Sequence, residues 1–94
     1  MDRILETIQE MRRSRGWDDT DTLPILIKSV AVEAGELLET IQWDEENIPM
    51  DEVRSELADV LMYALSICND EGWDVEEIIR EKIGDVYERY PEVK

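Results

Sequence analysis

The chain has 94 residues, which is enough for one domain with a small core. Its formal net charge of −15, from 25 acidic and 10 basic residues, argues against binding to DNA or RNA. Histidine is absent, which excludes His-based zinc sites and Ser-His or Cys-His nucleophiles and leaves oxygen-ligated magnesium, manganese or calcium as the metals to expect.

Apolar residues recur at helical spacing in four segments, and no segment has the alternation of a strand. The first predicted helix covers about 2–15, and Gly16 is expected to end it. The other three are predicted at about 22–42, 50–70 and 74–90. None of them approaches the roughly 20 apolar residues of a membrane span, and the N-terminal helix is too charged for a signal peptide. We therefore expect a cytoplasmic protein with no membrane partner.

Local signals mark the ends of these helices. A polar connector, WDDTDT, follows the first helix, and Thr22 is a candidate N-cap for the second. Asp74 followed three residues later by Glu77 resembles a capping box. Basic residues at the end of the first helix, Arg12 among them, are expected to complement the helix dipole.

These signals predict a small all-α four-helix bundle that forms a single domain, 1–94. Four short helices give a thin core, while the apolar stripes are broad. We therefore expect the bundle to be completed by oligomerisation, as a homodimer or a homotetramer. The single cysteine, Cys68, lies in an apolar run and is expected to be a buried thiol.

Two pairs of acids lie beside the apolar stripes of the second and third predicted helices. Glu33 and Glu36 have the spacing ExxE, and Glu56 and Asp59 have the spacing ExxD. On a helical wheel the first acid of each pair lies at the rim of the stripe and the second about 60° further out. An antiparallel hairpin of the two helices would therefore bring all four carboxylates together.

Either pair taken singly fits a solvated helix face, but the combination is costly. Acids one turn apart repel by about 0.2–0.5 kcal/mol, and no lysine or arginine lies one turn from Glu36. Gly35 costs about 1 kcal/mol relative to alanine in a helix, which indicates the close approach of another backbone or of a ligand. Because four clustered carboxylates need a counterion, the pattern favours a magnesium site.

The stretches that contain the two acid pairs are VEAGELLETIQW and SELADVLMYAL. They resemble the MazG-like all-α nucleoside triphosphate pyrophosphohydrolases, whose pattern is ExxE, a spacer and ExxD. The similarity extends outward to RSRGWDD and to DEGWDVEEIIREKIGDVYERYP, so it covers nearly the whole chain. It implies a hydrolase dependent on Mg²⁺, with Mn²⁺ as a substitute, that converts a nucleoside or deoxynucleoside triphosphate to the monophosphate and pyrophosphate. The implied role is house-cleaning of nucleotide pools.

The resemblance also implies roles for individual residues. The four paired acids would bind magnesium, and one of them, Glu36, would orient or deprotonate the attacking water. Lys82 and Arg89 would contact phosphates, while Trp17 and Trp43 would stack on the base. The alternatives are surface ion pairs for the two cations and hydrophobic plugs at helix ends for the two tryptophans.

One position departs from the family pattern, since Val86 stands where these enzymes have an asparagine four residues after the lysine. Two alternative functions stay open, and Val86 bears on the first. One is an acidic helical interaction module, either a catalytically lapsed relative or a charge mimic. The other is an enzyme like phosphoribosyl-ATP pyrophosphohydrolase. The sequence does not set the preferred base or sugar, or the number of metal ions.

Overall fold

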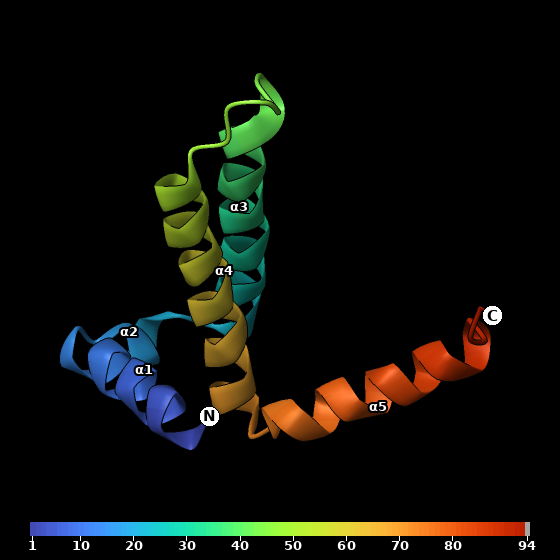
Figure 1. Cartoon of the computed structure of the whole chain (residues 1–94). Helices are drawn as coiled ribbons and strands as arrows, with labels where there is room; N and C mark the ends of the chain where they lie inside the picture. Colours follow the sequence, from blue (N-terminus) through green and yellow to red (C-terminus); the bar gives the residue numbers. More distant parts are fainter. Residues whose placement is uncertain (94) are drawn as a thin grey trace.

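The computed structural model describes residues 1–93, and these residues form helices and no strand (Figure 1). The five helices are α1 (Asp2–Ser14), α2 (Trp17–Thr20), α3 (Leu23–Gln42), α4 (Met50–Glu71) and α5 (Val75–Arg89). The all-α class is confirmed, and the limits of the four predicted helices agree with the structure to within one residue. The predicted polar connector is wrong in one respect, because α2 forms a helical turn within it.

The chain ends its helices where the local signals predict. Gly16 adopts the left-handed conformation, with φ of 73°, and its amide donates to the carbonyl of Arg13 at 3.1 Å. The side chain of Asp74 accepts a hydrogen bond from the backbone N–H of Glu77 at 3.0 Å, which caps α5. Thr22 occupies the N-cap position of α3, although its side chain makes no capping bond.

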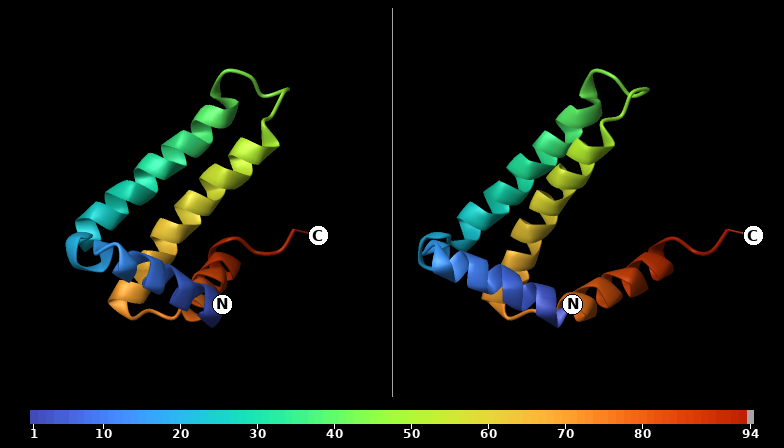
Figure 2. Two further views of the ribbon diagram at one scale, coloured as in Figure 1. Left: turned by 90° about the vertical axis from the view of Figure 1, so that its left-hand side faces the viewer. Right: turned by 60° about the vertical axis from the view of Figure 1, so that its left-hand side comes forward.

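An antiparallel hairpin of α3 and α4, joined by the loop 43–49, is the centre of the fold (Figures 1 and 2). Helices α1 and α2 lie across the open end of this hairpin, where α1 packs on α4. Few apolar side chains become fully buried in this arrangement: Ile8, Leu26, Cys68 and Val75. The thin core that the sequence predicts is therefore confirmed.

An ion pair between the buried Arg12 and the partly exposed Asp70 attaches α1 to α4. The guanidinium of Arg12 donates through Nη1 to Asp70 Oδ1 at 2.9 Å and through Nη2 to Asp70 Oδ2 at 3.0 Å. Arg12 lies in the last turn of α1, as predicted, but it is only 2% exposed, and the sequence did not predict its burial or its pairing with Asp70. Its spacing from Leu5 and Ile8 places it on the buried stripe of α1. Close by, the side-chain amide of Asn69 donates to the carbonyl of Leu5 at 3.2 Å.

Helix α5 projects away from the rest of the chain (Figures 1 and 2). The radius of gyration is 16.1 Å, whereas a compact domain of this length has about 12.4 Å. A single chain therefore does not form a closed four-helix bundle. None of the helices in residues 1–93 is long and apolar enough to cross a membrane.

Candidate functional site

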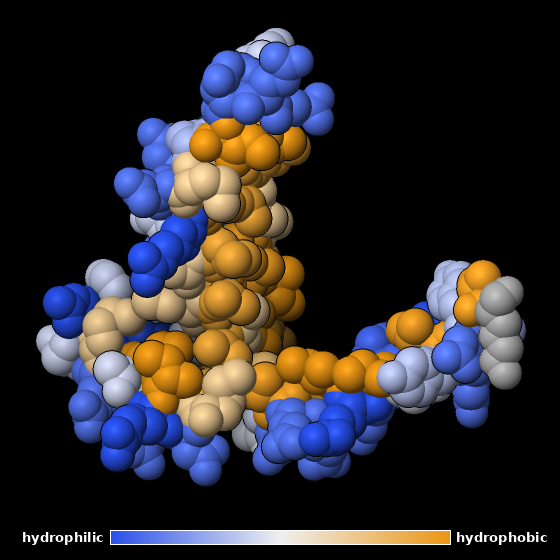
Figure 3. Space-filling model, in the orientation of Figure 1, coloured by the Kyte–Doolittle hydropathy of each residue, from blue (hydrophilic) through white to orange (hydrophobic). Residues whose placement is uncertain are grey.

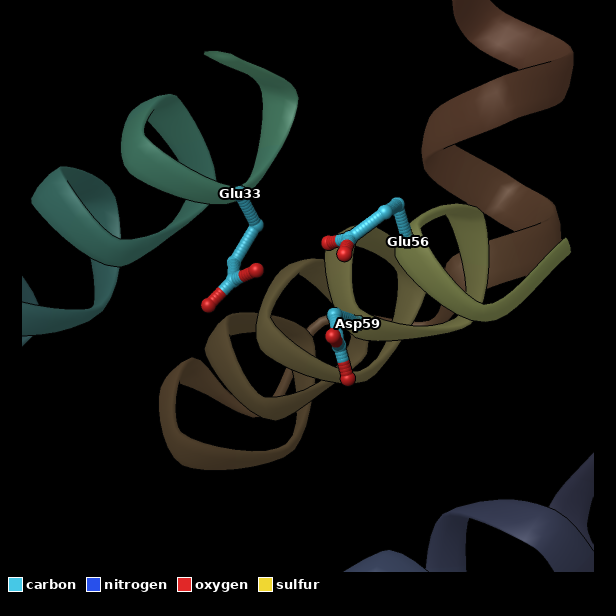
Figure 4. Close-up of side chains that lie close together, drawn as sticks. All are labelled: Glu33, Glu56 and Asp59. Atoms are coloured by element: carbon cyan, nitrogen blue, oxygen red, sulfur yellow. The ribbon is translucent and has the colours of Figure 1, made fainter. Parts of the chain in front are cut away.

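Three carboxylates converge between the two helices of the hairpin. Glu33 comes from α3, and Glu56 and Asp59 come from α4; their carboxylate oxygens lie within 4.8 Å of one another. Figure 4 shows the three side chains directed into the space between the helices. All three are half-buried, because they lie at the edge of the face along which α3 packs on α4. The expected convergence is therefore confirmed for these three acids.

The fourth acid, Glu36, is exposed and lies beside this group. Its carboxylate is the main reason that the pKa of Glu33 rises to about 7, with burial and the charges of Asp59 and Glu56 adding to the effect. The pKa of Glu56 is also raised, first by burial and then by the charges of Glu36 and Asp59. The neighbouring acids thus make Glu33 and Glu56 harder to ionise, as expected of clustered carboxylates.

Two oxygens in this cluster are buried without a hydrogen-bond partner, Glu33 Oε2 and Glu56 Oε2. Buried polar atoms are normally paired, since an unpaired one costs about 1–3 kcal/mol or more when the group is charged. A divalent cation would satisfy both oxygens and remove the repulsion between the acids. Carboxylate oxygens are also the ligands that Mg²⁺ and Mn²⁺ take, so the residues fit such an ion.

An aromatic residue lies beside the acids. Tyr63 follows Asp59 by one turn of α4, and its pKa is raised by partial burial and by the charges of Glu33 and Asp21. Tyr63 and Asp21 line a small cavity of about 40 Å³ together with Trp17 from α2. The spacing of Tyr63 from Asp59 indicates a shared face of α4 on the acidic flank, from which Tyr63 could reach a ligand or a partner subunit or pack in the core. Asp21 has no such signal in the sequence.

The other predicted substrate residues are not brought to the acids within one chain. Trp43 is 89% exposed and follows Glu33 by ten residues, which is roughly 15 Å along a helix. Lys82 and Arg89 lie on α5, where their side chains pair with Asp85 at 3.8 and 3.3 Å. The roles of these residues in binding substrate stay predictions.

Gly35 does not behave as predicted inside the chain. A Cβ atom built at this position would meet nothing within 4 Å, so no backbone of the chain itself approaches it. The expected approach of another backbone is therefore wrong within the single chain, and the approach of a ligand stays a prediction.

The central hairpin of this all-α fold carries a cluster of half-buried carboxylates whose oxygens could hold a divalent cation. The sequence matches the family "MazG nucleotide pyrophosphohydrolase domain" over residues 21–94, and the chain belongs to this family. Membership confirms the resemblance and supports activity as a nucleotide pyrophosphohydrolase.

A solved structure agrees with this assignment. The crystal structure of a pyrophosphatase from Archaeoglobus fulgidus DSM 4304 has 33% sequence identity to the chain and a TM-score of 0.90. The similarity covers 98% of this chain and 93% of that chain, so it includes residues ahead of the family match. Among curated proteins, no match was found.

Proposed function

We propose that the chain is a Mg²⁺-dependent nucleoside triphosphate pyrophosphohydrolase in which residues 1–94 act as one domain. It would convert a nucleoside or deoxynucleoside triphosphate and water to the monophosphate and pyrophosphate, as house-cleaning of cytoplasmic nucleotide pools. The observation that carries the proposal is the cluster of Glu33, Glu56 and Asp59, with two buried unpartnered oxygens, in a member of this family.

The four acids would hold Mg²⁺, or Mn²⁺ in its place. The chain carries a net charge of −15, and its acids alone would repel a triphosphate. When bound, the cation supplies neutralisation of phosphate charge and lowers the pKa of a water ligand. Half-burial of Glu33, Glu56 and Asp59 between two helices keeps their carboxylates in place, which reduces the reorganisation needed when substrate arrives.

Glu36 is the residue we propose to orient the attacking water and accept its proton. It is exposed and lies outside the group of three, so its oxygens are accessible to water. The bond that breaks is the anhydride between the α- and β-phosphorus atoms. The oxygen of water bonds to one of these phosphorus atoms, and the bridging oxygen leaves with the other.

Aromatic and basic residues would bind the rest of the nucleotide. Trp17 is the better placed of the two proposed stacking residues, because it shares a cavity with Tyr63 beside the acids. Trp43 lies ten residues beyond Glu33, so it would stack only on a base that extends along α3 away from the acids. Lys82 and Arg89 would contact phosphates only in an assembly that places α5 beside a hairpin of α3 and α4, which is one reason to propose a homodimer or homotetramer.

The test is release of pyrophosphate from a panel of ribo- and deoxyribonucleoside triphosphates that also includes phosphoribosyl-ATP. We expect release with Mg²⁺ and none with EDTA. Glu56→Gln should lower the rate on the order of 100-fold or more, because a charged ligand is lost. Glu52→Gln is the matched control: Glu52 lies one turn earlier on α4 and is exposed.

Three outcomes would count against the proposal. A folded wild-type protein that releases no pyrophosphate from any of these nucleotides would contradict the reaction. Full activity in Glu56→Gln would contradict the role of the acids. Equal loss in Glu52→Gln and Glu56→Gln would indicate a general effect of charge, as expected of an acidic interaction module.

A further inference from the structure

A small cavity of about 40 Å³ lies where α1 and α2 meet the hairpin of α3 and α4. Its lining includes four polar side chains: Arg12 from α1, Asp21 at the end of α2, and Tyr63 and Ser66 from α4. In this respect it differs from the face of the hairpin in Figure 3, where the surface is mainly apolar and continues onto α5. Polar groups enclosed in a cavity need hydrogen-bond partners there.

The guanidinium of Arg12 has one nitrogen left after it has paired with Asp70. Nη1 and Nη2 donate to the two carboxylate oxygens at 2.9 and 3.0 Å. Nε is buried and has no hydrogen-bond partner among residues 1–93. Because the side chain is only 3% exposed, bulk solvent does not reach this nitrogen. Arg12 therefore brings an unused donor to the wall of the cavity.

The size of the cavity decides what can occupy it. Sites for nucleotides and other small organic molecules have about 300–1,000 Å³, so a cavity of about 40 Å³ is too small for the substrate. A water molecule needs only about 10–15 Å³ of such volume, together with two to four polar partners. The cavity provides both the volume and the partners, so the occupant that fits is water.

The groups around the cavity match the hydrogen-bonding capacity of water. Nε–H of Arg12 can only donate, so a water would accept from it. The carboxylate of Asp21 is an acceptor, so the same water would donate to it. The hydroxyl of Ser66 donates to the carbonyl of Met62 at 2.7 Å, which leaves its lone pairs for the second hydrogen of the water. The hydroxyl of Tyr63 can take either role.

The charges around the cavity agree with this arrangement. The pKa of Arg12 is raised mainly by its hydrogen bond to Asp70, and the charge of Asp21 adds to the effect. The pKa of Tyr63 is raised first by burial and then by the charges of Glu33 and Asp21. Asp21 thus acts on both Arg12 and Tyr63, and Tyr63 lies between the cavity and the acidic cluster.

Helix α2 has little else to hold it in place. It has four residues, none of them buried. It ends where the amide of Asp21 donates to the carbonyl of Trp17 at 2.8 Å. A water bound to both Arg12 and Asp21 would connect this turn to the buried part of α1, and through Asp70 to α4. Trp17, at the other end of the turn, would be fixed by the same connection.

We propose that the cavity binds an ordered water that accepts a hydrogen bond from Nε of Arg12 and donates one to Asp21, and that Arg12 is thereby the positioning residue for α2 and Trp17. Asp70 holds one edge of the guanidinium, and the water holds the other. The water site does not depend on hydrolysis. Its effect on substrate binding rests on the proposed function, because it acts through Trp17.

Nuclear magnetic resonance of the isotope-labelled protein tests the water site. The Nε–H resonance of Arg12, assigned by through-bond correlation to its backbone, should show cross-peaks to water with NOE and ROE of opposite sign, the signature of a long-lived bound water. Asp21→Asn should shift this resonance, because it changes the charge of the acceptor. Asp19→Asn is the matched control, since Asp19 lies on α2 and is exposed, and it should leave the resonance unchanged.

Arg12→Lys tests the positioning role, because it keeps a cation beside Asp70 but removes Nε–H. The indole N–H resonance of Trp17 should shift in this variant, whereas that of Trp43, which is 89% exposed at the far end of α3, should not. In pyrophosphate release we expect KM to rise about threefold or more with kcat within about twofold, as for a loss of binding alone. Arg13→Lys, at an exposed neighbouring position, should change none of these quantities.

Several results would overturn the proposal. The water site is refuted if Nε–H of Arg12 shows no cross-peak to water, exchanges rapidly with bulk solvent, or responds equally to Asp19→Asn and Asp21→Asn. The positioning role is refuted by an unchanged indole resonance of Trp17, by an unchanged KM, or by a fall in kcat as large as the rise in KM.

Two further results are kept distinct. If Arg12→Lys unfolds, Asp21→Ala replaces it with the same expected shift and the same rise in KM, because it removes the other partner of the water. A chain that shows the bound water and the shifted Trp17 resonance but releases no pyrophosphate would refute the proposed function and support the water site and the positioning of α2.

Discussion

The ion pair between Arg12 on α1 and Asp70 on α4 allows the most quantitative prediction of stability. Asp70→Ala would leave the guanidinium of Arg12, which is 2% exposed, without the two hydrogen bonds of 2.9 and 3.0 Å. Removing one partner of a buried pair costs about 3–5 kcal/mol, because the other charge stays buried and unpaired. The side chain of Asp70 is 26% exposed, so water can reach the vacated position, and we expect the lower end, about 3 kcal/mol.

Urea unfolding followed by circular dichroism, at one fixed protein concentration, measures this cost. The matched control is Glu76→Ala, which breaks the ion pair to Arg80 of 2.7 Å between two exposed side chains. The control should cost less than about 0.5 kcal/mol. The reasoning would be refuted if Asp70→Ala cost less than 1 kcal/mol, roughly the upper limit for an exposed pair, or if the two variants cost the same. A double variant, Arg12→Met with Asp70→Leu, should recover much of the loss, because no charge then stays buried.

Three further predictions concern the acidic cluster and its surroundings. In EDTA the folded chain binds protons more tightly than the unfolded chain at Glu56 and at Glu33, whose pKa rises from 4.5 to about 7. The melting temperature Tm should therefore fall as the pH rises through this range. A Tm that rises from pH 5 to pH 8 would contradict this prediction, and Glu33→Gln should flatten the dependence of Tm on pH. Mg²⁺ should raise Tm at pH 8. The affinity of the protein for Mg²⁺, measured by calorimetry, should weaken below pH 7 because Glu33 takes up a proton. An affinity that does not depend on pH would count against Glu33 as a ligand. Trp17→Ala should raise KM by about 5- to 150-fold with a smaller effect on kcat, because it would remove stacking worth roughly 1–3 kcal/mol; an unchanged KM would exclude Trp17 from base binding.

The features that the sequence predicts correctly depend on neighbouring residues along the chain. Gly16 and Asp74 set the ends of helices through contacts within three residues of themselves, so their effects can be read without the tertiary structure. The convergence of Glu33 with Glu56 and Asp59 needs only the helical period and an antiparallel hairpin.

The features that the sequence does not predict depend on contacts between distant segments. Arg12 becomes buried because Asp70, 58 residues later, is placed against it. Tyr63 shares a cavity with Trp17 and Asp21 only because α2 lies at the end of the hairpin. The local sequence does not predict that α5 projects away from the hairpin. An amphipathic helix has the same pattern of apolar residues whether it packs on its own chain or on another.

The projection of α5 has a consequence for how the protein folds. Helices α3 and α4 are joined by a short loop, so their contacts are local in sequence and should form quickly, within the range of small helical proteins. Helix α5 has no such local partner, and its apolar residues Ile79 and Ile83 stay 51% and 43% exposed once the hairpin has formed. The folded chain therefore carries exposed apolar surface, so its solubility depends on the repulsion between its acidic residues.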